Sequence, residues 1–188
     1  KIMNRKLLVC ALSLFATNAF ALQPQRGYRG FLEWSNHVGN REYFGLEKKS
    51  TFFTGGSTSH GFQFNENLFV GGGLSIEKQT DDYSNNWIIP IFAEVRTDQK
   101  FGIFTPFADL RLGFSATDGG GLFVSPSIGY RFNWGRKMGI NVGIGLTVKG
   151  SRSELYESNW EGDTYYFKYI GDTDHYNAMF NFRIGIDF

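Results

Sequence analysis

The sequence predicts an all-β protein, an eight-stranded antiparallel up-and-down β-barrel that crosses a membrane. Three observations support this fold. About eight segments alternate apolar residues with polar or small ones, the last of these segments ends the chain on an aromatic residue, and the composition combines 18% aromatic residues with 24 glycines among 188 residues. That composition suits strands with bulky outer and small inner positions better than it suits a compact soluble core.

The last segment, residues 176–188, carries the clearest pattern. Its odd-numbered positions are mostly polar or small, and its even-numbered positions are apolar: Tyr176, Ala178, Phe180, Phe182, Ile184, Ile186 and Phe188. A period of two is typical of a strand with one apolar and one polar face. Since a tilted strand crosses a bilayer in about 9–11 residues, this segment is long enough to span.

Phe188, with apolar residues at alternate positions before it, resembles the C-terminal recognition signal of bacterial outer-membrane β-barrels. The resemblance implies that the barrel-assembly machinery inserts the chain into the outer membrane. It also implies lipid and lipopolysaccharide as the surroundings of the barrel. We interpret Phe188 as the assembly signal.

Seven further strands are predicted before this one, at residues 27–36, 51–63, 68–78, 87–96, 106–115, 122–132 and 138–149. Tight turns are expected at residues 65–67, 97–100 and 133–137. The other connections include the longest ones and cover residues 37–50, 80–86, 117–120 and 150–175. Single-chain bacterial barrels have an even number of strands, short periplasmic turns and longer extracellular loops. Both termini are therefore expected in the periplasm, and residues 150–175 form the longest extracellular loop.

A second resemblance lies in the hairpin of residues 58–65 and 68–73, which is similar to the second hairpin of small outer-membrane barrels common in Bacteroidetes. The predicted architecture resembles that of OmpA- and OmpX-type barrels. This group includes structural anchors, adhesins, small channels and enzymes that modify lipid A, so the fold alone does not select a function.

The N-terminal residues have the features of an export signal. Arg5 and Lys6 precede an apolar run at residues 7–15, and Ala19-Phe20-Ala21 has the small-x-small pattern of a cleavage site. We interpret residues 1–21 as a signal peptide and residues 22–188 as the barrel domain. Removing this peptide takes three basic residues and no acidic one from a net charge of +1, which leaves −2 and argues against a nucleic acid partner.

The polar face of the strands is predicted to point inward. The interior of an eight-stranded barrel is only just wide enough for side chains to fill it, so it has no room for the apolar faces of every strand. A basic residue on the lipid face would cost about 2–4 kcal/mol near the midplane. We therefore expect an interior ladder of opposite charges: Arg29, Glu33, Glu77, Glu94, Arg96, Asp109, Arg111, Arg131, Lys149, Arg183 and Asp187. This ladder is expected to close the lumen, and a narrow porin-like channel is the alternative.

Catalytic chemistry has little support in the sequence. The His-x-Ser pair of the lipid A deacylases is absent, so we predict no catalytic residue and no cofactor, with a lipid A- or phospholipid-modifying enzyme as the alternative. His37 and His175 are expected near the outer ends of the first and last strands, close to Asp172 and Asp174. They are weak candidates for a metal or hydrolytic site, because a structural zinc site needs more ordered ligands. Solvated rim residues are the simpler interpretation.

The predicted loop 150–175 is the strongest candidate for recognition. It interleaves acidic residues with six aromatic ones: Tyr156, Trp160, Tyr165, Tyr166, Phe167 and Tyr169. Tyr and Trp are enriched in binding hot spots, which favours a surface-binding role toward an extracellular protein or glycan, with a structural role also open. We expect the barrel to be a monomer. The alternative is that these residues extend the last two strands and belong to the outer aromatic girdle.

Overall fold

The computed structural model describes residues 26–43, 47–80, 86–99, 104–117, 121–134, 138–161 and 164–188. These residues form one antiparallel sheet that closes on itself, because β2 pairs both with β1 and with β3. The strands are β1 (Gly27–Tyr43), β2 (Glu47–Gln63), β3 (Leu68–Thr80), β4 (Trp87–Ile88), β5 (Pro90–Asp98), β6 (Phe104–Ser115), β7 (Leu122–Trp134), β8 (Met138–Glu161) and β9 (Thr164–Asp187).

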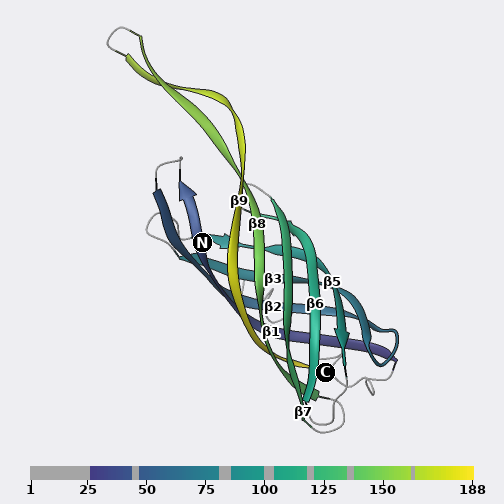
Figure 1. Cartoon of the computed structure of the whole chain (residues 1–188). Helices are drawn as coiled ribbons and strands as arrows, with labels where there is room; N and C mark the ends of the chain where they lie inside the picture. Colours follow the sequence, from purple (N-terminus) through teal and green to yellow (C-terminus); the bar gives the residue numbers. More distant parts are fainter. Residues whose placement is uncertain are drawn as a thin grey trace, which may run out of the picture.

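Strands β4 and β5 together occupy one strand position in the barrel, and the ladder is interrupted between them. Both pair with β3, β4 through Glu77 and Lys78 and β5 through residues 68–74. The interruption falls at Ile89, directly before Pro90, which lacks the N–H group that a continuous ladder requires. Counting this position once gives the predicted eight-stranded antiparallel barrel (Figure 1).

The first and last strands close the barrel. They pair from Phe31 opposite Asp187 to Gly39 opposite Met179. Gly30 and Phe188 continue this seam, because each donates its N–H to the other's carbonyl, at 2.9 and 3.0 Å. A Cβ atom on Gly30 would lie 2.7 Å from the Phe188 ring, so glycine is what allows the last residue to seat there.

The outer surface of the barrel is apolar, as expected for a strand face in contact with lipid. Alternate residues along each strand are exposed, such as Leu32, Ile128 and Phe180, whereas the residues between them are mostly buried. Exposed aromatic residues gather near both ends, with Phe104, Phe132 and Trp134 at the end that holds the C-terminus, and Trp87 and Tyr176 at the other end. Among the described residues, no helix is long and apolar enough to span a bilayer.

Several strands are longer than predicted. β1 continues to Tyr43 and β2 begins at Glu47, so most of the expected loop 37–50 is strand. Asp98 belongs to β5 and Asn133 to β7, although both residues were predicted in turns. The largest difference is at residues 150–175, where β8 and β9 continue as paired strands instead of a loop (Figure 1). Backbone pairing sustains these extensions where no apolar alternation marks them.

The interior contains large apolar side chains beside the predicted charges. Six phenylalanines are buried inside the barrel: Phe31, Phe53, Phe69, Phe92, Phe107 and Phe123. Neighbouring glycines make room for the rings, since a Cβ atom on Gly71, two residues along β3, would lie 2.6 Å from the Phe69 ring, and one on Gly129, opposite Phe107, would lie 2.6 Å from the Phe107 ring.

Candidate functional site

All eleven charged residues that the sequence assigns to the interior are buried, and Asp98 joins them. In the described part of the chain, six buried Arg or Lys side chains thus meet six buried Asp or Glu side chains. Ion pairs arrange them in three layers along the barrel. We call these the C-terminal layer, the middle layer and the hairpin layer, the last lying toward the end where β8 and β9 extend.

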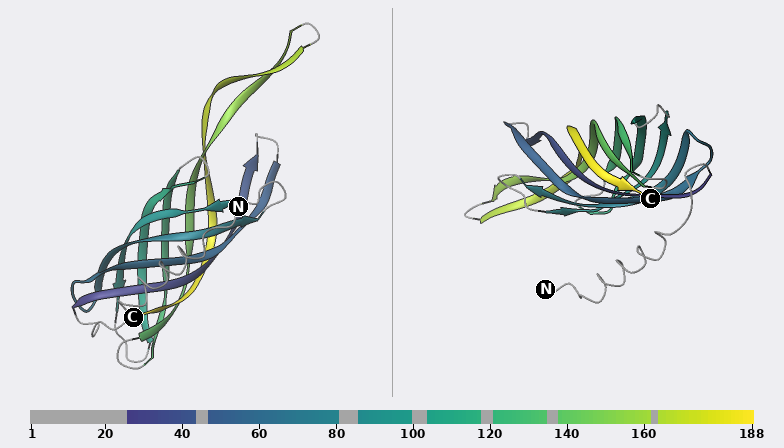
Figure 2. Two further views of the ribbon diagram at one scale, coloured as in Figure 1. Left: turned by 180° about the vertical axis from the view of Figure 1, so that it is seen from behind. Right: turned by 90° about the horizontal axis from the view of Figure 1, so that it is seen from below.

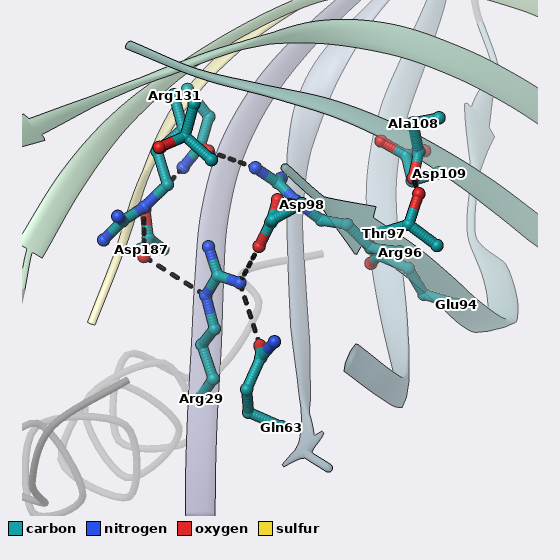
Figure 3. A network of polar contacts seen from close by, with 12 residues as sticks. Arg29, Gln63, Glu94, Arg96, Thr97, Asp98, Ala108, Asp109, Arg131 and Asp187 are labelled. Atoms are coloured by element: carbon teal, nitrogen blue, oxygen red, sulfur yellow. Dashed lines mark hydrogen bonds and ion pairs between the residues drawn. The ribbon is translucent and has the colours of Figure 1, made fainter. Parts of the chain in front are cut away.

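The C-terminal layer contains Arg29, Arg96, Arg131, Asp98 and Asp187 (Figure 3). Arg29 pairs with both aspartates, and its Nε lies 3.2 Å from Asp187 Oδ2. Arg96 Nε donates to Asp98 Oδ1 at 2.8 Å, and Arg131 Nε donates to Asp187 Oδ1 at 2.8 Å. Three cations therefore share two anions, and neutral acceptors complete the set: Gln63 accepts from Arg29 and Asn141 from Arg96.

The middle layer has the opposite balance, with Arg111 and Arg183 among Glu33, Glu94 and Asp109. Arg183 Nη2 donates to both oxygens of Asp109, at 2.7 and 2.6 Å, and its Nη1 lies 3.4 Å from Glu33 Oε2. Arg111 pairs with Glu33 and lies 3.3 Å from Glu94 Oε2. The two arginines thus bridge carboxylates from three strands, β1, β5 and β6.

The hairpin layer holds the Lys149–Glu77 ion pair, and Ser75 donates to Glu77 at 2.7 Å. Lys149 Nζ also lies 4.4 Å from the centre of the Phe53 ring. His37 is buried here, with Nε2 3.6 Å from Glu77 Oε1. The prediction of His37 as a solvated rim residue is therefore wrong, because its odd position places it on the inward face of β1.

Aromatic rings pack against these cations and separate the layers. The guanidinium of Arg96 lies 3.6 Å from the centre of the Phe107 ring and 4.7 Å from that of Phe31, within the range of cation–π attraction. Among the described residues, a pocket lined by Phe53, Phe123 and Lys149 lies at the hairpin end of the barrel, and another lined by Arg29, Asp98 and Arg131 lies at the opposite end. No residue of the middle layer lines either pocket.

His37 and His175 do not form a common site. His37 lies opposite Asn181 in the β1–β9 ladder, and His175 is six residues further along β9, which corresponds to roughly 20 Å of strand. In the described part of the chain, no group of three or more His, Cys, Asp or Glu side chains could hold a metal ion. The side chains of Asp172, Asp174 and His175 lie outside what the structure describes.

The region predicted as an aromatic loop is a two-stranded hairpin. β8 pairs with β7 only as far as Lys149, and β9 pairs with β1 only as far as Met179. Beyond these residues the two strands pair with each other, up to Glu161 opposite Thr164. Figures 1 and 2 show this ribbon rising above the rim of the barrel. We call residues 150–161 and 164–178 the outer hairpin.

A bulge in the outer hairpin changes its register. Leu155 pairs with Gly171, but Tyr156 pairs with Tyr169, so Ile170 is an extra residue in β9. Gly171 has φ +148°, a backbone conformation that other residues rarely adopt. Beyond the bulge, Ser158 pairs with Phe167 and Trp160 with Tyr165.

This register places five of the six predicted aromatic residues on one face. Paired positions, and alternate positions along a strand, belong to the same face of a ladder. By backbone register, the aromatic face therefore comprises positions 156, 160, 165, 167 and 169 (Tyr156, Trp160, Tyr165, Phe167 and Tyr169), together with Ser158; the side chains of these residues lie outside what the structure describes. Tyr166 pairs with Asn159 and belongs to the opposite, mainly polar face. Sequence reasoning missed this arrangement, because the extra residue Ile170 shifts the parity of β9.

The aromatic face lies beyond the level of the membrane girdle. The exposed Tyr176 pairs with Gly150 at the outer end of the barrel, and Tyr156 is six residues further along β8, roughly 20 Å of strand. Two rows of charged positions lie between them, Arg152 opposite Asp174 and Glu154 opposite Asp172. The girdle interpretation therefore suits Tyr176, whereas the aromatic face belongs to a separate region.

Comparison with known proteins agrees with this architecture. The sequence matches the outer membrane protein beta-barrel domain family over residues 7–188. The crystal structure of Neisserial surface protein A (NspA) is similar in fold, with a TM-score of 0.58 over 86% of this chain and 97% of that one, at 11% identity.

A more distant likeness is to the translocator domain of the autotransporter NalP from Neisseria meningitidis, at 11% identity. It covers 98% of this chain and 95% of that one, but a TM-score of 0.30 is too low to support an argument. No curated protein sequence gives a significant match.

Proposed function

The chain belongs to the outer membrane protein beta-barrel domain family, and we propose that it is a surface-binding member whose recognition element is the outer hairpin. The observation that supports this proposal is the length of the hairpin beyond the barrel. β8 continues for twelve residues, 150–161, past its last pairing with β7 at Lys149. None of this length is needed to cross a bilayer, since about 9–11 residues suffice.

The barrel supplies a rigid base for this element. Its interior is packed with paired charges and rings, so the ends of β8 and β9 are fixed where the hairpin begins. Binding residues concentrate on segments that a rigid scaffold positions, and Tyr and Trp supply large contact areas at low entropic cost. The one-sided arrangement of the aromatic positions favours a surface for contact over a general solvated loop.

Removing the hairpin tests the proposal. Because Arg152 pairs with Asp174, residues 153–173 can be replaced by Asn-Gly, which favours a two-residue turn between paired strands. We expect the truncated protein to fold and to keep heat-resistant mobility on gels, since every barrel pairing is retained. Binding to arrays of extracellular proteins and glycans should be present for the full-length protein and absent for the truncated one.

The aromatic face has a matched control in the same hairpin. Replacing Tyr156, Trp160, Tyr165 and Phe167 by Ser should abolish the binding that truncation abolishes. Replacing Tyr166 by Ser should leave it within about twofold, because this residue belongs to the opposite face and lies outside the proposed contact. Equal array profiles for full-length and truncated protein would overturn the proposed function.

A further inference from the structure

The outer hairpin has two backbone edges, and they are not equivalent. In the described chain, β8 beyond Lys149 no longer pairs with β7, and β9 before Met179 no longer pairs with β1, so each strand of the hairpin pairs only with the other. On β9, the bulge at Ile170 and Gly171 interrupts the regular spacing of N–H and C=O groups. Bulges are one of the devices that protect an edge from further pairing. β8 contains no extra residue, so its edge at residues 156–161 is regular.

A two-stranded ribbon is marginally stable in water, and a third strand or a packing partner stabilises it. An extended peptide can supply that strand by adding to a free edge, with backbone hydrogen bonds for affinity and alternate side chains for specificity. The aromatic face offers enough area for a macromolecular partner. An aromatic side chain buries about 150–250 Å², so five approach the roughly 800 Å² per partner of a stable protein interface.

Charge restricts the chemistry of that partner. Residues 150–175 contain six acidic and two basic side chains in the sequence, a formal net charge of −4. A second copy of the hairpin would oppose −4 with −4, and like charges across an interface are costly. At the β8 edge itself, residues 156–161 include Glu157 and Glu161 and no basic residue.

We propose that the β8 edge of the outer hairpin, residues 156–161, binds an extended cationic polypeptide segment as a third strand. This inference rests on the proposed function of the hairpin as the recognition element. Alternate residues of the added strand would neighbour Glu157 and Glu161 on the polar face, which favours Arg or Lys at those positions. The other residues would neighbour Tyr156 and Trp160, where apolar or cationic side chains both gain contact, the latter through cation–π attraction.

The test uses the full-length protein in lipid nanodiscs and a labelled peptide of sequence Arg-Val-Arg-Tyr-Arg-Val-Arg-Tyr, with binding measured by fluorescence anisotropy. We expect binding that weakens at least tenfold when Glu replaces the four arginines, and that weakens as salt rises. Methylation of alternate backbone nitrogens of the peptide keeps its charge but removes the N–H groups that would donate hydrogen bonds to the β8 edge. It should weaken binding by a similar factor if the peptide adds as a strand.

A charge-matched pair of variants locates the edge. Glu157→Lys with Glu161→Lys should reduce peptide affinity at least tenfold, whereas Asp172→Lys with Asp174→Lys, the same change in net charge on the other strand, should reduce it only about threefold through long-range attraction. Equal losses, or indifference to backbone methylation, would overturn the β8 assignment. Hairpin-dependent dimers in sedimentation, or hairpin-dependent glycan binding without peptide binding, would overturn the cationic partner and leave the proposed function standing. If no partner binds the full-length protein more tightly than the truncated one, both the cationic partner and the proposed function of the hairpin are overturned.

Discussion

Arg183 is one of the two cations that balance the three carboxylates of the middle layer. It donates to both oxygens of Asp109 and lies near Glu33. Replacing it by Met leaves three buried carboxylates with Arg111 as the one cation of the layer. Breaking a buried ion pair from one side costs about 3–5 kcal/mol. We expect Arg183→Met to lower the free energy of unfolding by about this amount, measured by urea unfolding in lipid vesicles.

The matched control for Arg183 is Asp109→Asn. This change leaves two arginines with two glutamates, so the loss of stability should be clearly smaller than for Arg183→Met. The reverse order would show that pairing geometry, and not the balance of charge, determines the stability of the layer. Substitutions by Met and Asn keep most of the side-chain volume, which limits any contribution from a cavity.

Single residues also show what sequence reasoning misses. Parity along each strand identified the buried charges, because a lone charge on the lipid face is costly. The same parity placed Phe107 on the inward face, but a phenylalanine in a barrel strand is equally compatible with lipid. Its inward role depends on Arg96 above the ring and on Gly129 beside it, which come from two other strands.

At the scale of elements, the seam between β1 and β9 decides whether the barrel closes. Gly30→Ala would drive a Cβ atom toward the Phe188 ring, at 2.7 Å, and should displace the last residue of the seam. We expect slower folding into vesicles and loss of heat-resistant mobility at a lower temperature. Gly56→Ala is the control, because the nearest atom to its added Cβ is 3.9 Å away. Equal behaviour of the two variants would show that closure of the barrel does not require glycine at position 30.

The extent to which each element was predictable follows from its surroundings. Lipid selects an apolar outer face, so the spanning part of every strand shows a period of two that the sequence reveals. Outside the bilayer neither face meets lipid, and the outer hairpin keeps its backbone pairing without that signal. Asp98 was missed for a related reason, because the stretch Thr97-Asp98-Gln99-Lys100 has the polar composition of a turn although its first two residues are in β5.

At the scale of the whole molecule, the three charge layers compensate one another. The C-terminal layer has one more cation than anions, the middle layer has one more anion than cations, and the hairpin layer pairs Lys149 with Glu77. Six cations and six anions are thus balanced over the described barrel. Because the C-terminal and middle layers have net charges of opposite sign, they attract each other along the barrel axis. The buried charges therefore stabilise the barrel as one network and not only as separate ion pairs.

This packing predicts a barrel that does not conduct. The middle layer spans the lumen between the two end pockets, and an ion would have to separate Arg111 and Arg183 from their carboxylates to pass. Planar-bilayer recordings of the full-length protein should therefore show no large, stable conductance, and the truncated hairpin variant should behave in the same way. Replacing Arg111, Arg183, Glu33, Glu94 and Asp109 together by Ser removes every charge of the middle layer and creates space, so conductance should appear. A stable conductance in the unmodified protein would show that these ion pairs line a channel instead of closing it.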